Sequence, residues 1–402
     1  MKKIITLFII LVNISLIGLF NPFNENPAEI ADRKNTEIYY PIINSDFNFS
    51  NSLVNIYDLN IFTEGHKITK DEKKTLTKDD LKMYISYNVN IFRFGKQNWD
   101  VAFTTHAFGK SKVLSKEFAE LIFYGNEEEE YTANSGEGTK GFVFSKIAFN
   151  YAFPNEYHMT FLPESNKKGN FLDSIREIPI YLGLKFNIYY PYTYFGVPKS
   201  RQKFGSTDIL GYYTYDYELN YSDEKTSNRL SAGLGFGIKA KYSKGTIHFS
   251  LDDIFGSLNF DDLYGKTEER IYEDTLAFLH PDHEATSIHN TQEFRIKDKL
   301  ISISPTFMMG FDYHLNEILS FMAKYKNSKY EYPDGFSVGV DYHLANKIPI
   351  QFNIGTDRNF YYEFKTGILS KRFEYMLSVT FFDGFLIFSK GFGIKTGIKY
   401  KY

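Results

Sequence analysis

Residues 392–402 close the chain with the sequence FGIKTGIKYKY, in which apolar and polar side chains alternate without a break. A period of two indicates a β-strand with one apolar face and one polar, hydrated face. Soluble domains seldom end on such a strand, because chain termini usually fray. The apolar face carries Phe392, Ile394, Thr396, Ile398, Tyr400 and Tyr402.

The same alternation recurs along the chain, in Met83–Ile91, Ile180–Tyr189, Leu230–Tyr242, Phe336–Leu344 and Phe373–Phe381. These lengths match the ~9–11 residues that a tilted strand needs to cross a bilayer. Strands of soluble sandwiches are shorter, about 5–6 residues. The pattern therefore favours membrane-crossing strands.

The polar faces of these segments carry charged side chains, which a soluble core would have to neutralise or pair. They suit the hydrated or polar-packed interior of a closed antiparallel transmembrane β-barrel. The alternative is a soluble sandwich whose outer faces carry the charges; its many strand glycines would then lack a reason. The candidates to face the lumen are Lys185, Lys239, Lys241, Asp312, Asp341 and Lys395.

Composition agrees with an all-β membrane class. The 402 residues include 32 Tyr and 40 Phe against a single Trp, and the formal net charge is -3. Beyond the N-terminus no run of 18 apolar residues predicts a transmembrane helix. No basic patch points to nucleic acid. The absence of cysteine excludes a disulfide framework and a lipid-anchored N-terminus.

The N-terminus reads as a secretory signal. Lys2 and Lys3 precede the apolar run Ile4–Phe20, and a basic start followed by a short apolar core is typical of export. We expect residues 1–20 to be the signal peptide and 21–402 to form one barrel domain. The alternative is an uncleaved anchor helix, although the run is shorter than a full span of ~20 residues.

Connections between the strands alternate in length. Short turns fall near residues 244, 316, 345 and 370, and we place them all on the side where the last strand ends. Long polar loops are predicted at Gly109–Lys140, Pro191–Thr207 and Gly256–Lys299. Outer-membrane barrels have short periplasmic turns and long outer loops. The tally predicts about 14 strands, an even number if both termini are periplasmic.

The C-terminus resembles the sorting signature of bacterial outer-membrane barrels: a polar residue, a glycine and two aromatics, here Lys395, Gly397, Tyr400 and Tyr402. The resemblance implies recognition by the barrel assembly machinery and a location in the bacterial outer membrane, with outer-membrane lipid around the apolar faces.

Four further motifs resemble the FadL, TraF and PorV-like group of outer-membrane barrels, and within it an uncharacterised family that opens with Asn-Pro-Ala. They are Asn26-Pro-Ala-Glu-Ile-Ala31, Gly233-Leu-Gly-Phe-Gly237, Lys239-Ala-Lys-Tyr-Ser-Lys-Gly245 and Leu251-Asp-Asp-Ile-Phe-Gly256. The family's short helical insertion before a Gly-Asn pair corresponds to Ser115–Tyr124.

The group implies a barrel of about 14 strands, with passage of hydrophobic molecules past an N-terminal plug in FadL-type members and protein secretion in PorV-like members. Here only about fifteen residues separate the signal from the first strand-like segment, Thr36–Ile42, too few for a full plug. An inward fold of 191–207 or 109–140 would then close the lumen.

The rest of the chain contains no clear motif for a metal site or a catalytic site. One loop is rich in metal ligands (His280, Asp282, His283, Glu284 and His289) but lacks the regular spacing of known sites, so we expect no metal and no cofactor. No motif joins a nucleophile to a base, so we expect no enzyme. The first hypothesis is a channel or transporter for small or hydrophobic molecules. The alternative is a non-transporting structural or secretion-accessory barrel that acts through its surface loops.

Overall fold

The computed structural model describes the greater part of the chain. It covers residues 26–32, 38–58, 67–96, 98–124, 130–154, 157–160, 177–206, 210–242, 244–275, 286–316, 318–328, 335–344, 348–357, 359–370 and 373–401. The predicted signal peptide, Tyr402 and most of the ligand-rich loop, residues 280–284, lie outside this part.

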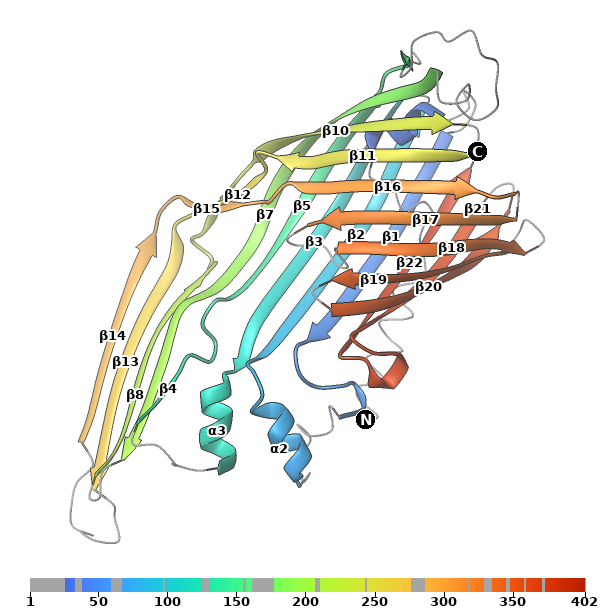
Figure 1. The fold of residues 1–402 in the computed structure, drawn as a ribbon. Coiled ribbons are helices and arrows are strands. Elements are labelled where there is room, and N and C mark those ends of the chain that lie inside the picture. Colours follow the sequence, from blue (N-terminus) through green and yellow to red (C-terminus); the bar gives the residue numbers. More distant parts are fainter. Residues whose placement is uncertain are drawn as a thin grey trace.

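Fourteen antiparallel strands form a closed ring, which confirms the predicted all-β barrel (Figure 1). Each strand pairs with the next, and β22 pairs with β1 in a register that sets Lys395 opposite Asp46. In order around the ring the strands are β1 (Ile38–Asn51), β2 (Leu81–Lys96), β3 (Trp99–Leu114), β5 (Thr139–Ala152), β7 (Glu177–Ser206), β10 (Ser231–Tyr242), β11 (Gly245–Ile254), β16 (Thr306–His314), β17 (Leu319–Asn327), β18 (Gly335–Leu344), β19 (Ile348–Asp357), β20 (Asn359–Leu369), β21 (Phe373–Phe382) and β22 (Gly391–Lys401).

The remaining elements lie inside the ring, beside it or beyond its ends. They are η1 (Pro27–Asp32), α2 (Lys70–Leu76), α3 (Lys116–Tyr124), β4 (Glu130–Ala133), β6 (Tyr157–Thr160), β8 (Leu210–Tyr221), β9 (Ser227–Arg229), β12 (Ser257–Asp261), β13 (Leu263–Thr275), β14 (Thr286–Ile296), β15 (Lys299–Ser302) and η4 (Leu386–Phe388). The predicted helical insertion is confirmed as α3, where the Ser115 hydroxyl accepts a hydrogen bond from the Phe118 amide at 3.3 Å.

The alternation predicted from the sequence separates two faces of the wall. Large apolar side chains such as Leu184, Leu234 and Phe336 are about half exposed on the outside. Their sequence neighbours on the inside are buried and polar, as Lys185 is between Leu184 and Phe186. An outward apolar face and an inward polar face are the arrangement that a bilayer requires of a barrel.

The strand ends on either side of the four predicted short turns all lie at one end of the barrel, as predicted. The register places His314 opposite Ser320, Leu319 opposite Tyr342, and Phe373 opposite Tyr400. These pairs lie at the end where the last strand finishes. The elements α2 and α3 lie at the other end (Figure 1).

Two of the predicted long loops are wrong in large part, because they are strands. Pro191–Thr207 falls in the 30-residue β7, whose second half leaves the ring and pairs with β4 and β8. Gly256–Lys299 contains β12, β13 and β14. Together β4, the second half of β7, β8, β13 and β14 form a sheet that projects from the barrel at the lower left of Figure 1. We call it the outer sheet.

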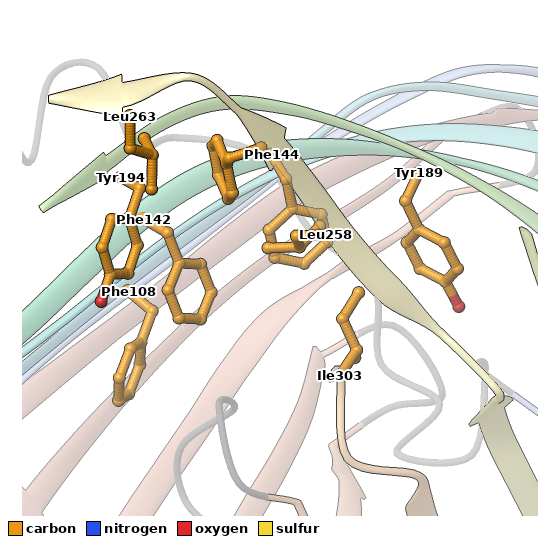
Figure 2. Close-up of a cluster of buried hydrophobic side chains, with 9 residues drawn as sticks. Phe108, Phe142, Phe144, Tyr189, Tyr194, Leu258, Leu263 and Ile303 are labelled. Carbon is orange, nitrogen blue, oxygen red and sulfur yellow. The ribbon is translucent and has the colours of Figure 1, made fainter. Parts of the chain in front are cut away.

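An apolar cluster lies inside the barrel, toward the end from which the outer sheet projects (Figure 2). There β12, part of a small sheet with β9 and β15, packs against the inward aromatic side chains of β3, β5 and β7. The inward-folded elements are therefore β12 and the segment around Ile303, and not 191–207 or 109–140 as predicted. The cluster comprises Phe108, Phe142, Phe144, Tyr189, Tyr194, Leu258, Phe260, Leu263 and Ile303.

Candidate functional site: the barrel interior

The short N-terminal turn η1 lies inside the barrel. The Asn26 side chain is wholly buried and donates to the carbonyls of Ile238, at 3.0 Å, and Phe249, at 3.2 Å, on two neighbouring strands. Its own Oδ1 accepts from the Ala28 amide at 2.9 Å. The Asn-Pro-Ala motif thus fixes η1 to the inner wall of β10 and β11.

Glycines make room for this turn. A Cβ atom on Gly237 would lie 1.8 Å from Asn26 Oδ1, and one on Gly183 would lie 2.4 Å from the Ala28 nitrogen. Both distances are far below van der Waals contact, so only glycine fits at these two positions. On the glycine-rich face of 231–242, Gly237 makes room for the N-terminal turn, whereas Gly233 lies against Tyr189 and Gly235 against Asp252.

Glu29 of η1 binds the wall electrostatically. Its Oε2 lies 2.7 Å from Lys239 Nζ, and its Oε1 lies 2.5 Å from His248 Nδ1. The other ring nitrogen of His248 lies 3.1 Å from Asp312 Oδ2. The structure thus joins two predicted lumen residues, Lys239 and Asp312, through Glu29 and His248, which sequence reasoning missed.

A second buried network surrounds Asp252 and Asp253 at the end of β11. Asp253 adopts a positive φ of 58°, and the register of β10 and β11 shifts at this point. Two adjacent carboxylates can be buried only if cations and donors compensate them. Here the compensating groups are Lys146, Lys185, Asn187 and Tyr189.

The remaining predicted lumen residues also have polar or aromatic neighbours. Lys395 Nζ lies 3.5 Å from Asp46 Oδ2, and Asp341 Oδ2 lies 3.1 Å from His343 Nε2. The Lys241 ammonium lies over the ring of Tyr181, 5.6 Å from its centroid. The six candidates therefore do not form one site but are distributed around the inner wall.

Two hollows differ sharply in character. Inside the barrel, a cavity of about 210 Å³ is lined mainly by lysine, asparagine, serine and threonine side chains of β1, β2, β17, β20 and neighbouring strands. On the outer wall, a groove of about 600 Å³ is almost entirely apolar. Its sides are Trp99, Val101, Phe149, Tyr151, Leu184, Phe186, Leu234, Phe236 and Ile254, and its floor reaches Asp100, Asn150, Lys185 and Gly235.

The outer sheet is held by ion pairs at its surface. Arg295 Nη2 lies 2.6 Å from Asp223 Oδ2, and the hydrogen bond from Arg295 holds the pKa of that carboxyl below its ordinary value. Hydrogen bonds from Lys266 and Tyr217 lower the pKa of Glu268 to about 2. The outer sheet therefore depends on ionised carboxylates.

Of the five residues of the ligand-rich loop, only His289 lies in the described part of the chain. It is on β14, and its Nε2 lies 3.1 Å from Glu268 Oε1. Within the described ranges, no group of three or more metal-ligating side chains converges. Among the same residues, no helix is long and apolar enough to span a membrane.

This chain is similar to known proteins in its three-dimensional structure only. No family model and no curated protein matches the chain. The TodX deltaS2S3 mutant monoaromatic hydrocarbon channel aligns over 96% of this chain and 95% of its own, with 9% identity and a TM-score of 0.46. The Ralstonia pickettii toluene transporter TbuX covers 94% and 92%, with 8% identity and a TM-score of 0.43. A Pseudomonas aeruginosa FadL homologue covers 94% and 93%, with 8% identity and a TM-score of 0.40.

Proposed function

We propose that the protein is an integral outer-membrane barrel that transports small hydrophobic molecules. The observation that carries the proposal is the apolar groove in the outer wall over β3, β5, β7 and β10. A hydrophobic solute can occupy such a groove because its lining is apolar and concave.

The groove lies where the wall departs from a regular ladder. Its floor includes Gly235, which has no side chain to fill the wall, beside the register shift between Leu234 and Phe236. Inside the barrel, the apolar cluster around Phe144 and Phe260 lies along the same strands, β5 and β7. A route from the groove to the interior would pass the buried ion pair of Lys185 and Asp252.

Two elements occupy the interior beside these strands. The turn η1 occupies one part of the interior, and β12 covers the aromatic side chains of another. Transport therefore requires a displacement of η1 or β12. Both are short elements that lie against the inner wall without joining the ring.

The test is uptake of toluene or naphthalene by Gram-negative cells that produce the barrel, compared with cells that lack it, because these solutes cross a plain phospholipid bilayer unaided. We expect the barrel to raise uptake and Leu234→Trp, which fills the groove, to abolish the increase. The matched control is Val340→Trp, an exposed outward side chain on β18, which should leave uptake unchanged. Absence of an increase with a correctly inserted wild-type barrel, or equal uptake by both variants, would contradict the proposal.

The accessory alternative is supported by the outer sheet, a projecting surface larger than a barrel needs for closure. Its strands β8 and β13 pair over twelve positions, from Leu210 opposite Thr275 to Tyr221 opposite Tyr264. An accessory barrel would lose its envelope partners when residues 263–296 are replaced by a short turn, yet would not take up hydrocarbons. Co-purification of envelope proteins with wild type and with this deletion separates the two functions.

A further inference from the structure

The outer sheet has two unequal edges. One edge strand is β4, which has only 4 residues and lies beside α3, whose Phe118 stacks on Phe204 of the adjoining β7 with ring centroids 5.4 Å apart. The other edge strand is β14, which has 11 residues and, among the strands that the structure describes, pairs with β13 alone. It forms the left-hand border of the sheet in Figure 1. The outer sheet therefore has one short edge and one long, open edge.

The strand β14 carries none of the features that block an open edge. Its register with β13 runs through eleven positions without a bulge. Its sequence, TSIHNTQEFRI, contains neither proline nor lysine. Proteins place these residues, or a bulge, on an edge strand to prevent pairing with another chain. Residues 287–294 are all exposed, so a further strand can reach this edge.

The sequence of β14 is complementary to itself. Residues that lie opposite each other in an antiparallel pair face the same side of the sheet, so a strand paired with its own copy is centred on one residue. Centring the pair on Thr291 sets Ile288 opposite Phe294 and His289 opposite Glu293. The first pair joins two apolar side chains that are 47% and 37% exposed, and the second joins a base to a carboxylate. Both kinds of cross-strand pair stabilise a sheet.

The two neighbouring registers lack this complementarity. Centring the pair one residue earlier sets Ile288 opposite the polar Gln292. Centring it one residue later sets His289 opposite Arg295, so that two basic side chains meet. Of the three registers, the one centred on Thr291 alone joins apolar to apolar and base to acid.

Contacts within the chain already hold the ionic pair in place. His289 Nε2 lies 3.1 Å from Glu268 Oε1 on β13, and Glu293 accepts a hydrogen bond from the Tyr264 hydroxyl. Both side chains therefore lie on the same face of the outer sheet, where the corresponding residues of a second copy would meet them.

We propose that β14 pairs antiparallel with β14 of a second copy of this chain. The strand β13 leads away from the barrel and β14 returns to it, so antiparallel pairing places the two barrels at opposite ends of the joined sheet (Figure 1). Because the outer sheet projects beyond the end of the barrel, the two copies belong to two facing outer membranes. The contact then joins two cells, independently of what passes through the barrel.

Oxidative cross-linking of the purified full-length barrel tests the register, because the chain has no cysteine. Thr291→Cys would meet its own copy with Cα atoms about 4.5–5.5 Å apart, a separation that a disulfide spans. We expect a shift from monomer to dimer on a non-reducing gel. Ile288→Cys and Phe294→Cys should each remain monomeric alone and form a dimer when mixed.

The matched control is Thr267→Cys on the inner strand β13, which should remain monomeric. A Thr291→Cys barrel that stays monomeric, or an equal yield of dimer from Thr267→Cys, would overturn the proposal.

A charge at the centre of the pair tests the facing membranes. Gram-negative cells that produce the wild-type barrel should settle as clumps. Thr291→Lys sets like charges opposite each other, as does Thr291→Glu, so each should abolish clumping. Mixing the two cell populations should restore it, and cells with Thr267→Lys should clump as wild type. Dispersed wild-type cells, or clumping of Thr291→Lys cells alone, would contradict the contact between copies.

Discussion

Glu29 Oε2 lies 2.7 Å from Lys239 Nζ, although the two residues are 210 positions apart in the sequence. Both side chains are buried inside the barrel, with 7% of Lys239 and 11% of Glu29 exposed. An ion pair withdrawn from water in this way persists only when its geometry is fixed by other contacts. Here the hydrogen bonds of Asn26 to the β10 and β11 carbonyls supply that fixation.

The N-terminal turn should leave its place when its glycine pocket is filled. Gly237→Val would force side-chain atoms into the position of Asn26, and overpacking of this kind costs about 1–3 kcal/mol. The chain has no cysteine, so Ala28→Cys is a unique probe at a wholly buried position. We expect slow maleimide labelling of that cysteine in the wild-type background and fast labelling with Gly237→Val. Ala240→Val, on the same strand but facing outward, should label slowly; equal rates in all three would refute the placement of the turn.

Removal of a buried carboxylate should destabilise the barrel strongly. Asp100 is 1% exposed and accepts hydrogen bonds from Arg93 Nε at 3.0 Å and from Asn150 at 2.6 Å. Asp100→Ala removes the carboxylate that binds the buried Arg93 guanidinium, which should lower the free energy of unfolding by about 3–5 kcal/mol.

The matched control is Asp216→Ala. Asp216 pairs with Lys199 at the exposed surface of the outer sheet, where an ion pair contributes about 0–1 kcal/mol. Guanidinium titrations of the refolded barrel in micelles measure both changes. Similar losses for the two variants would show that Asp100 is not in a buried pair.

The outer sheet should loosen in acid. The pKa of Glu268 is lowered to about 2 from an ordinary 4.5, first by the hydrogen bond from Lys266 and then by that from Tyr217. A depressed carboxyl pKa stabilises the fold above the unfolded value, and this contribution is lost as pH falls from about 4.5 through 2. Other charged groups against Glu268 are Arg270 and His289.

Hydrogen exchange of β8 and β13, corrected for the intrinsic rate, measures this response. Protection should be unchanged between pH 7 and 5 and should fall below pH 4. Glu268→Gln should already be less protected at pH 7 and should respond less to acid. Identical pH profiles for the two proteins would mean that Glu268 does not support the outer sheet.

The C-terminal sequence should direct assembly. We propose that Lys395, Gly397, Tyr400 and Tyr402 form the signal that the barrel assembly machinery reads. Replacing both tyrosines by alanine should reduce the outer-membrane level several-fold, while the purified variant still refolds in detergent. The double variant Tyr313→Ala/Tyr342→Ala, on internal strands, controls for the loss of aromatic side chains. Normal assembly of the C-terminal variant would contradict the proposal that these residues form the sorting signal.

Strict alternation made the barrel predictable. Segments such as 231–242 and 392–402 have one bilayer-facing side and one lumen-facing side, so a period of two records both the strand and its orientation. The four short turns followed from the same pattern. The outer sheet was missed although 210–221 does alternate, with tyrosines at 213, 215, 217 and 221 between Thr214, Asp216, Glu218 and Asn220. Its many polar residues resemble those of a loop. Pro191 and Pro198 also favoured a loop in the sequence where the structure has the long strand β7.

The interior was only partly predictable. Lys185 and Lys239 were found because a lysine between apolar residues of a strand must face away from lipid. Their partners Glu29 and Asp252 come from a different turn and a different strand, and local pattern carries no information on which strands meet. Gly237 of β10 was one available signal, because a glycine on an inward face indicates that another segment approaches closely.

The single tryptophan provides the most direct test of the two-faced wall. Trp99 is 42% exposed on the outer face of β3 and packs edge-on against Phe94, with ring centroids 5.6 Å apart, next to the inward Asp100. In liposomes the account predicts blue-shifted Trp99 emission that is quenched by lipids brominated on their acyl chains and not by iodide in the water. Emission near that of free tryptophan, quenched by iodide and indifferent to brominated lipid, would contradict it.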